Sequence, residues 1–97
     1  MKRLFISQPM RGKTDEEILA ERTLAVQVVK ERTGEDVGVI DSFFAGTTLS
    51  PLECLGESLK LLAKADIAYF TRGWEGARGC VVEWMCAEEY GIPYIVE

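Results

Sequence analysis

The chain has 97 residues, a formal net charge of −5 and no histidine. This length favours one domain spanning residues 1–97. The acidic charge, without a basic stripe, makes nucleic acid a poor partner because duplex binding depends on neutralising phosphates. An anionic membrane surface is disfavoured for the same reason, and no segment approaches the ~18 apolar residues of a membrane span.

The cysteines and the missing histidine restrict the chemistry further. Cys54, Cys80 and Cys86 are an odd number without close pairs, which does not predict a disulfide framework. We interpret them as small buried hydrophobic residues in a reducing compartment and expect a cytoplasmic protein. Without histidine, three scattered cysteines do not make a metal site. The apolar run at residues 4–6 is too short for a signal peptide.

In the first half of the chain, short apolar runs alternate with amphipathic segments. Residues 4–6 form the first predicted strand, and Thr14 opens a helix in which Glu17 completes a capping box. This helix ends at Thr33-Gly34 and is followed by a strand at residues 37–40. The predicted buried stripe of the helix comprises Ile18, Ala25 and Val29, flanked by Leu24 and Val28.

The second half continues the alternation after an irregular segment at residues 42–48. Ser50 caps a second helix with Pro51 in its first turn, and a strand follows at residues 66–70. A loop at residues 71–76 leads to a third helix at about 77–90 and a last strand at 94–96. The predicted buried face of the second helix comprises Leu52, Leu55, Leu59 and Leu62.

The order β-α-β-α-β-α-β with nearly continuous apolar strands predicts an α/β fold of three layers, α/β/α. We expect a four-stranded parallel sheet in the order 2-1-3-4, flavodoxin-like or Rossmann-like. Ligands of such sheets bind outside the carboxyl ends of the strands, where the strand order switches. Here the switch lies between strands 1 and 3, so the loops 7–13 and 71–76 and the residue Asp41 after strand 2 meet at one edge.

The first of these loops places Arg11, Gly12 and Lys13 at a helix N-terminus, where unpaired N–H groups and the helix dipole favour an anion. Arginine adds a fork suited to phosphate or carboxylate. The alternative is an ordinary loop with solvated charges, because the glycine spacing matches neither a P-loop nor a dinucleotide fingerprint. The predicted ligand contacts of this loop are Ser7, Gln8, Pro9, Met10, Arg11 and Gly12.

The loop that begins at residue 71 has similar features, with two glycines and an arginine before a helix. Trp74 either stacks on a base or sugar or covers the hydrophobic core. Ala77, Arg78 and Gly79 are the other candidate contacts. Glu83, one turn into the helix beside Cys80, is a candidate nucleophile or acid/base. Spacing alone favours an exposed glutamate on the helix face.

Two further polar residues have local alternatives. Ser58 faces inward with Leu55 and Leu62, where a buried hydroxyl bonds the carbonyl one turn back. It contacts a ligand only if it lies near the site end of its helix. Asp66 begins the third strand at the opposite end of the sheet, and we interpret it as structural.

Three segments together carry a family resemblance: Phe5–Gly12, Ala65-Asp66 and Gly73–Glu83. They resemble the nucleoside 2-deoxyribosyltransferase-like superfamily, and in particular its small branch of often phage- or prophage-borne proteins, over nearly the whole chain. The resemblance implies a Rossmann-like fold, no cofactor or metal, and homo-oligomers in which a neighbouring subunit completes each site.

The resemblance also implies a chemistry. Characterised members cleave the N-glycosidic bond of a 2′-deoxynucleoside or its monophosphate. A glutamate, which Glu83 matches, attacks C1′ and forms a covalent sugar ester, from which another base or water takes the sugar. The chain departs from the family at three positions. Ser58 stands near the place of an aspartate that assists the leaving base, Ala77 replaces an Asp or Ser, and Phe5 replaces a tyrosine.

Three functions are therefore compatible with the sequence. The first is a deoxyribosyltransferase or a deoxynucleotide N-glycosidase with Glu83 as nucleophile. The second is a module that binds or sequesters a nucleotide with little catalysis, because loss of a general acid typically costs about 10²–10⁴-fold in rate. The third is an oligomeric interaction protein whose interface is the Phe43-Phe44 loop.

Overall fold

The four strands pair into one parallel sheet with helices on both faces. The computed structural model describes residues 1–44 and 46–97, so one residue of the irregular segment 42–48 lies outside the described part. The strands are β1 (Lys2–Ser7), β2 (Val37–Val39), β3 (Ile67–Phe70) and β4 (Tyr94–Val96). Their order is β2-β1-β3-β4, with every pairing parallel. The predicted strand order is confirmed.

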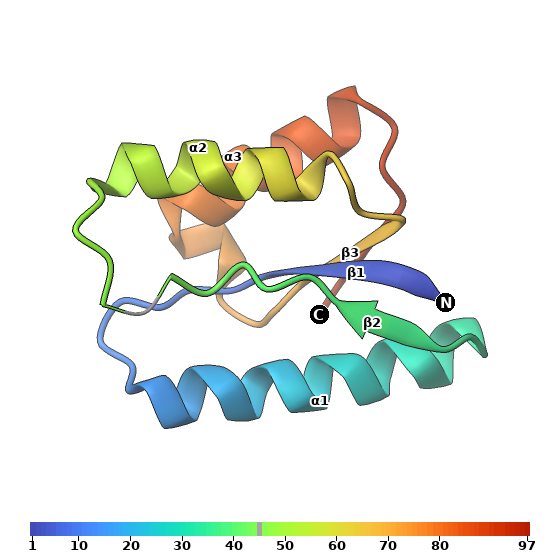
Figure 1. Cartoon of the computed structure of the whole chain (residues 1–97). Coiled ribbons are helices and arrows are strands. Elements are labelled where there is room, and N and C mark those ends of the chain that lie inside the picture. Colours follow the sequence, from blue (N-terminus) through green and yellow to red (C-terminus); the bar gives the residue numbers. More distant parts are fainter. Residues whose placement is uncertain (45) are drawn as a thin grey trace.

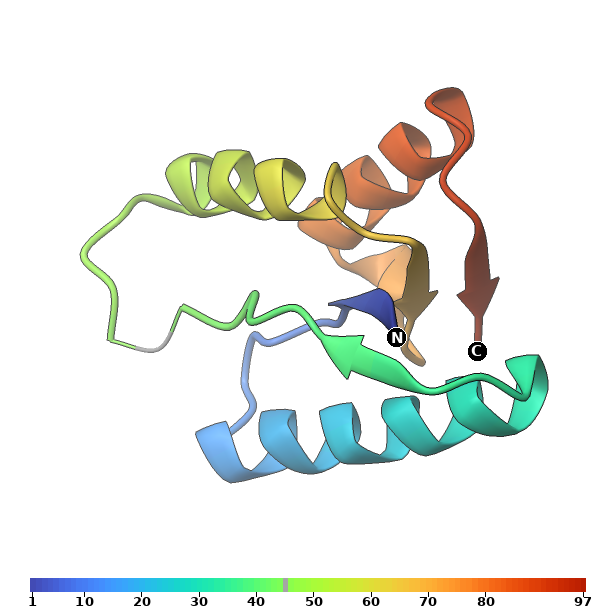
Figure 2. The ribbon, with the colours of Figure 1, turned by 45° about the vertical axis from the view of Figure 1, so that its right-hand side comes forward.

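The helices complete three layers (Figures 1 and 2). α1 (Asp15–Thr33) covers one face of the sheet, and α2 (Pro51–Leu62) and α3 (Arg78–Glu89) cover the other. A short 3-10 helix, η1 (Trp74–Gly76), lies in the loop before α3. The flavodoxin-like or Rossmann-like architecture follows from this arrangement.

Local signals explain where the helices begin and end. Thr14 and Ser50 both form the predicted capping boxes, each with the glutamate three residues later. Gly34 closes α1 in the left-handed conformation, with φ of 69°. The N-cap of α3, Ala77, has no side chain that can accept a hydrogen bond from the first turn. The first N–H groups of α3 therefore lack a side-chain cap.

The core lies on both faces of the two central strands. Leu4 and Ile6 of β1 pack toward α1, whereas Phe5 of the same strand and Phe70 of β3 pack toward α2 and α3. All four side chains are almost fully buried. Strands buried on both faces explain the continuous apolar runs in the sequence.

Two leucines predicted on the buried side are exposed. Leu52 is 76% exposed because the first turn of α2 extends past the sheet, and only Leu62 at the other end of α2 is buried. Leu24 is 61% exposed because it lies about 100° around α1 from Ala25, which contacts the sheet. The three cysteines are free, and only Cys80 is buried, so the expectation of three buried cysteines was wrong for two.

The opposite edge of the sheet holds structural features. The Asp66 carboxylate accepts a hydrogen bond from the Arg3 backbone N–H at 2.7 Å and ties the starts of β3 and β1 together. Across the described residues, no helix is both long enough and apolar enough to span a bilayer.

Candidate functional site

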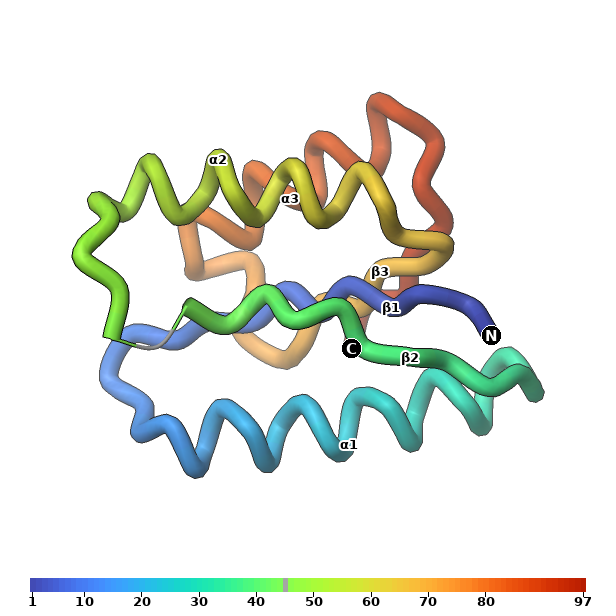
Figure 3. The backbone as a smooth tube through the Cα atoms, viewed as in Figure 1, coloured from blue at the N-terminus to red at the C-terminus, as the bar shows by residue number. Residues whose placement is uncertain are grey.

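A cavity of about 370 Å³ opens at the carboxyl edge of the sheet. Figure 3 shows the chain leaving β1 and β2 on the same side of the molecule, where α2 also begins. Four segments line the cavity: the loop after β1, the segment after β2, the first eight residues of α2 and the first half of α3. The lining residues are Gln8, Pro9, Met10, Arg11, Ser42, Phe43, Phe44, Pro51, Cys54, Leu55, Ser58, Ala77, Gly79, Cys80 and Glu83.

Glu83 is the carboxylate of this cavity. It is only 7% exposed, because α3 packs inward through Cys80, Glu83 and Ala87. The Ser7 hydroxyl, at the buried end of β1, donates a hydrogen bond to Glu83 Oε1 at 2.6 Å. An exposed helix-face glutamate, which spacing alone favours, was therefore the wrong alternative. The short hydrogen bond fixes the carboxylate against the sheet edge.

The surroundings of Glu83 change its protonation. Burial raises its pKa from the ordinary 4.5 to about 7, while the Ser7 hydrogen bond, the charge of Arg22 and the Ser58 hydroxyl lower it in part. Glu83 therefore holds its proton to a much higher pH than an exposed glutamate does. Burial also raises the pKa of the Cys80 thiol to about 11, so this neighbour stays neutral and unreactive at pH 7.

The structure brings most of the first predicted loop to the cavity. Gln8, Pro9, Met10 and Arg11 line it directly. Ser7 lies behind Glu83 as its hydrogen-bond donor. Gly12 lies outside the lining and turns the chain with φ of 78°, a conformation that favours glycine.

This loop is also fastened to α1. The Gln8 side chain donates to the Ile18 carbonyl at 3.2 Å and to the Glu21 carboxylate at 3.0 Å. Lys13 pairs with the same carboxylate at 2.9 Å. Its charge is therefore engaged within the protein, whereas Arg11 stays exposed at the cavity mouth.

The second predicted loop divides between the cavity and the core. Ala77 and Gly79 line the Glu83 cavity. Arg78 lines an adjoining cavity of about 520 Å³, which Arg11 and the turn at 73–76 also border. Trp74 instead packs on Phe70 and Trp84, with ring centroids 5.5 and 5.6 Å apart. Of the two alternatives for Trp74, the structure supports covering the core.

Two other predicted contacts have separate positions. Ser58 is half-buried and lines the Glu83 cavity, although it lies past the middle of α2. Asp41 is exposed and lines a different cavity of about 370 Å³, between α1 and the segment after β2, together with Arg22 and Phe43. Phe43 lines both cavities and so separates them.

Sequence reasoning missed Arg22, which is 7% exposed on the face of α1 toward the sheet. A usable signal was present, because Arg22 falls four residues after Ile18 and three before Ala25, on the predicted buried stripe. Ser42, which also lines the Glu83 cavity, lies in an irregular segment without a comparable signal.

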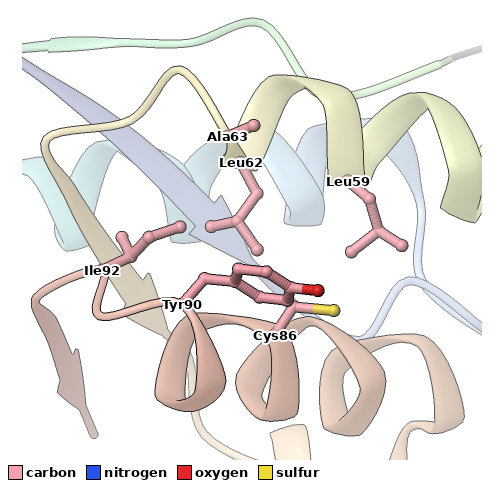
Figure 4. A pocket seen from close by; sticks show the side chains of 6 residues that line it. All are labelled: Leu59, Leu62, Ala63, Cys86, Tyr90 and Ile92. Carbon is pink, nitrogen blue, oxygen red and sulfur yellow. The ribbon is translucent and has the colours of Figure 1, made fainter.

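A further pocket, of about 400 Å³, shares no lining residue with the Glu83 cavity (Figure 4). It sits between the C-terminal ends of α2 and α3, near the amino ends of β3 and β4. It is almost entirely apolar and is lined by Leu59, Leu62, Ala63, Cys86, Tyr90 and Ile92. It offers no charged group to a substrate, so the chemistry of the chain is better placed at the carboxyl edge.

Comparisons with known proteins add no family to these observations. No protein-family model matches the chain, and no curated protein matches it. Within the described residues, no three Cys, Asp or Glu side chains are grouped so that they could hold a metal ion. The function proposed below therefore depends on the geometry of the site and on the resemblance of its motifs.

Proposed function

We propose that the chain binds a 2′-deoxynucleoside or its 5′-monophosphate at the carboxyl edge and that Glu83 attacks C1′ of the sugar. One observation carries the proposal. A buried carboxylate, fixed by Ser7 at 2.6 Å, faces a cavity at the edge where parallel α/β sheets bind ligands. The motif resemblance supplies the substrate class, and the cavity supplies a nucleophile where that class of enzyme requires one.

The proposed reaction has two displacements. An ionised Glu83 oxygen forms a bond to C1′ while the C1′–N bond breaks, and the electron pair and a solvent proton go to the departing base. Water or a second base then attacks C1′ and gives up a proton to solvent, while the ester bond breaks and returns the glutamate as a carboxylate, so the configuration at C1′ is retained. A pKa of about 7 leaves a useful fraction of Glu83 ionised at neutral pH.

Two features of the edge support an anionic substrate group. Arg11 and Arg78 border the adjoining cavity, and the first turn of α3 has no side-chain cap. Arginine forks and free N–H groups at a helix start both suit a phosphate. The two cavities share the stretch 9–11 and the residues Ala77 and Gly79. A phosphate in the second cavity would thus remain connected to a sugar over Glu83.

The aromatic lining supports a planar group in the first cavity. Phe43 and Phe44 are half-buried and border the same space as Glu83. Their rings can stack on a nucleobase. We therefore assign this pair to the ligand and not to an interface between subunits, and we assign to it the stacking role considered for Trp74.

The test is incubation of the protein with the common 2′-deoxynucleosides and their 5′-monophosphates. We expect released base in chromatography and, by mass spectrometry, a sugar adduct on the peptide that contains Glu83. Glu83→Gln should abolish both. Arg11→Ala should weaken the binding of the monophosphates more than the binding of the nucleosides. Arg72→Ala removes an exposed arginine that borders neither cavity and should leave activity unchanged.

A second function, nucleotide binding without efficient cleavage, is favoured by one observation. Glu83 is the only carboxylate among the described residues that line its cavity, so no second acid is placed to protonate the departing base. Such a module would be stabilised against heat by a nucleotide and release no base. No released base, no adduct and no thermal shift across all substrates would reject both functions.

A further inference from the structure

Arg22 is a buried charge that the proposed reaction does not use. It lies on the face of α1 toward the sheet and is 7% exposed. Its Nη2 donates to the Ser42 hydroxyl at 2.9 Å, while its buried Nε has no hydrogen-bond partner in the structure. Within the described residues it forms no ion pair. Burying an arginine without a paired carboxylate is costly, so a role in a site accounts for this arginine better than packing does.

The hydrogen bond connects Arg22 to the wall of the Glu83 cavity. Ser42 is itself buried and lines that cavity, as do the next two residues, Phe43 and Phe44. Arg22 lines the cavity on the other side of Phe43. Residues 42–44 therefore separate the Arg22 guanidinium from the Glu83 cavity. The hydrogen bond from Arg22 to Ser42 holds this segment in place.

The charge of Arg22 also reaches Glu83. Two acids interact favourably with it, the exposed Asp41 and the buried Glu83. Arg22 and Glu83 are both largely removed from solvent, so water and salt screen their interaction little. Opposite charges in such surroundings favour the ionised form of each other.

We propose that Arg22 is a positioning residue of the candidate site, which fixes the cavity wall at Ser42 and places its positive charge behind the cavity that Glu83 lines. The consequence for catalysis rests on the proposed function of Glu83. The coupling between the two charges does not, and it can be measured without any substrate.

The other groups around Glu83 define what else can titrate there. Ser7 from β1 and Ser58 from α2 are hydroxyls and stay neutral. Cys80 from α3 interacts with Glu83, and its raised pKa of about 11 keeps it neutral below pH about 9. Arg22 from α1 is the one charged partner that acts on Glu83. A change in the titration of Glu83 on neutralising Arg22 is therefore attributable to Arg22.

The first test is a carbon-13 NMR titration of the Glu83 carboxyl, assigned by its absence in Glu83→Gln. In Arg22→Gln we expect the midpoint to move up, so that a smaller share of Glu83 is ionised at neutral pH. Arg22→Lys keeps the charge and should keep the midpoint within about 0.3 unit. A midpoint in Arg22→Gln equal to that of the wild type overturns the proposal.

The effect of Arg22 on the cavity wall at residues 42–44 is measured separately. The backbone amide resonances of Phe43 and Phe44 should shift in Arg22→Gln and, in the same direction, in Ser42→Ala, which removes the hydrogen bond and retains the charge. Ser42→Ala should leave the Glu83 midpoint in place. Unmoved Phe43 and Phe44 amides in Arg22→Gln would contradict the positioning of the wall.

A measurement on the wild type covers the case in which the Arg22 variants do not fold. The Nε–H resonance of Arg22 should titrate with the same midpoint as the Glu83 carboxyl and become independent of pH in Glu83→Gln. An Arg22 resonance that ignores the Glu83 titration rejects the coupling. Absence of nucleoside cleavage would reject the proposed catalysis. The titrations would still decide whether Arg22 interacts with Glu83, because they need no substrate.

Discussion

Glu83 should make the protein less stable as the pH rises, and the structure sets the size of this effect. Burial holds its pKa at about 7 in the folded chain, against 4.5 for an ordinary glutamate. The folded state thus binds this proton more tightly than the unfolded state. The resulting stability is fully present below about pH 4.5 and is lost as the pH rises through about 7. A rise of about 2.5 units at about 1.4 kcal/mol per unit gives about 3 kcal/mol.

Glu83→Gln removes this dependence because the amide does not ionise. Urea unfolding of wild type and variant at pH about 4.5 and about 8 should show the variant gaining about 3 kcal/mol relative to the wild type at the higher pH. Exposed acids with lowered pKa values, such as Glu17, Glu53 and Asp66, contribute equally to the free energy of unfolding of both proteins, so their contribution cancels in the difference. Glu89→Gln, which removes an exposed carboxylate from the same helix, is the matched control. Parallel pH dependences of wild type and Glu83→Gln would refute the reasoning.

Three further substitutions test the fold and the site. Ser7→Ala removes the 2.6 Å hydrogen bond that favours ionised Glu83, so the carboxyl should titrate at a higher pH in an NMR experiment; an unchanged or lower midpoint would contradict the role of Ser7. Trp74→Ala empties the space between Phe70 and Trp84 and should lower the free energy of unfolding by about 3 kcal/mol in urea; a loss below about 1 kcal/mol would show that Trp74 does not cover the core. Thr14→Ala removes the N-cap of α1 and should lower that free energy by about 1 kcal/mol, whereas Thr23→Ala, on the exposed face of the same helix, should change it little.

The fold could be predicted because its signals are local or follow from handedness. Capping boxes at Thr14 and Ser50 place two helix starts, and Gly34 places one end. Alternation of strands and helices with right-handed crossovers then leaves few possible strand orders. Leu52 was misplaced because helical periodicity describes a face and not where the sheet beneath that face ends.

The candidate site could be predicted only to the level of an edge. Topology brought the loops after β1, β2 and β3 together, and Arg11 and Ala77 indeed border the cavities there. Which aromatic side chain faces the cavity depends on tertiary packing, and local sequence could not separate Trp74 from Phe43 in this respect. The segment after β2, which supplies Ser42 and Phe43 to the lining, has no period from which their positions could be inferred.

The most informative residues of the site are charges that occupy core positions of their helices. Arg22 interrupts the buried stripe of α1, and Glu83 interrupts that of α3, where apolar side chains would stabilise the fold more. These two helices cover opposite faces of the sheet (Figure 1), yet Glu83 lines the same cavity as Ser42, the hydrogen-bond partner of Arg22. Burying a cation on one helix and a carboxylate on the other costs stability, because neither has an ion-pair partner among the described residues. The fold does not require either charge at these helix positions, so both belong with the binding or catalytic role proposed for this edge.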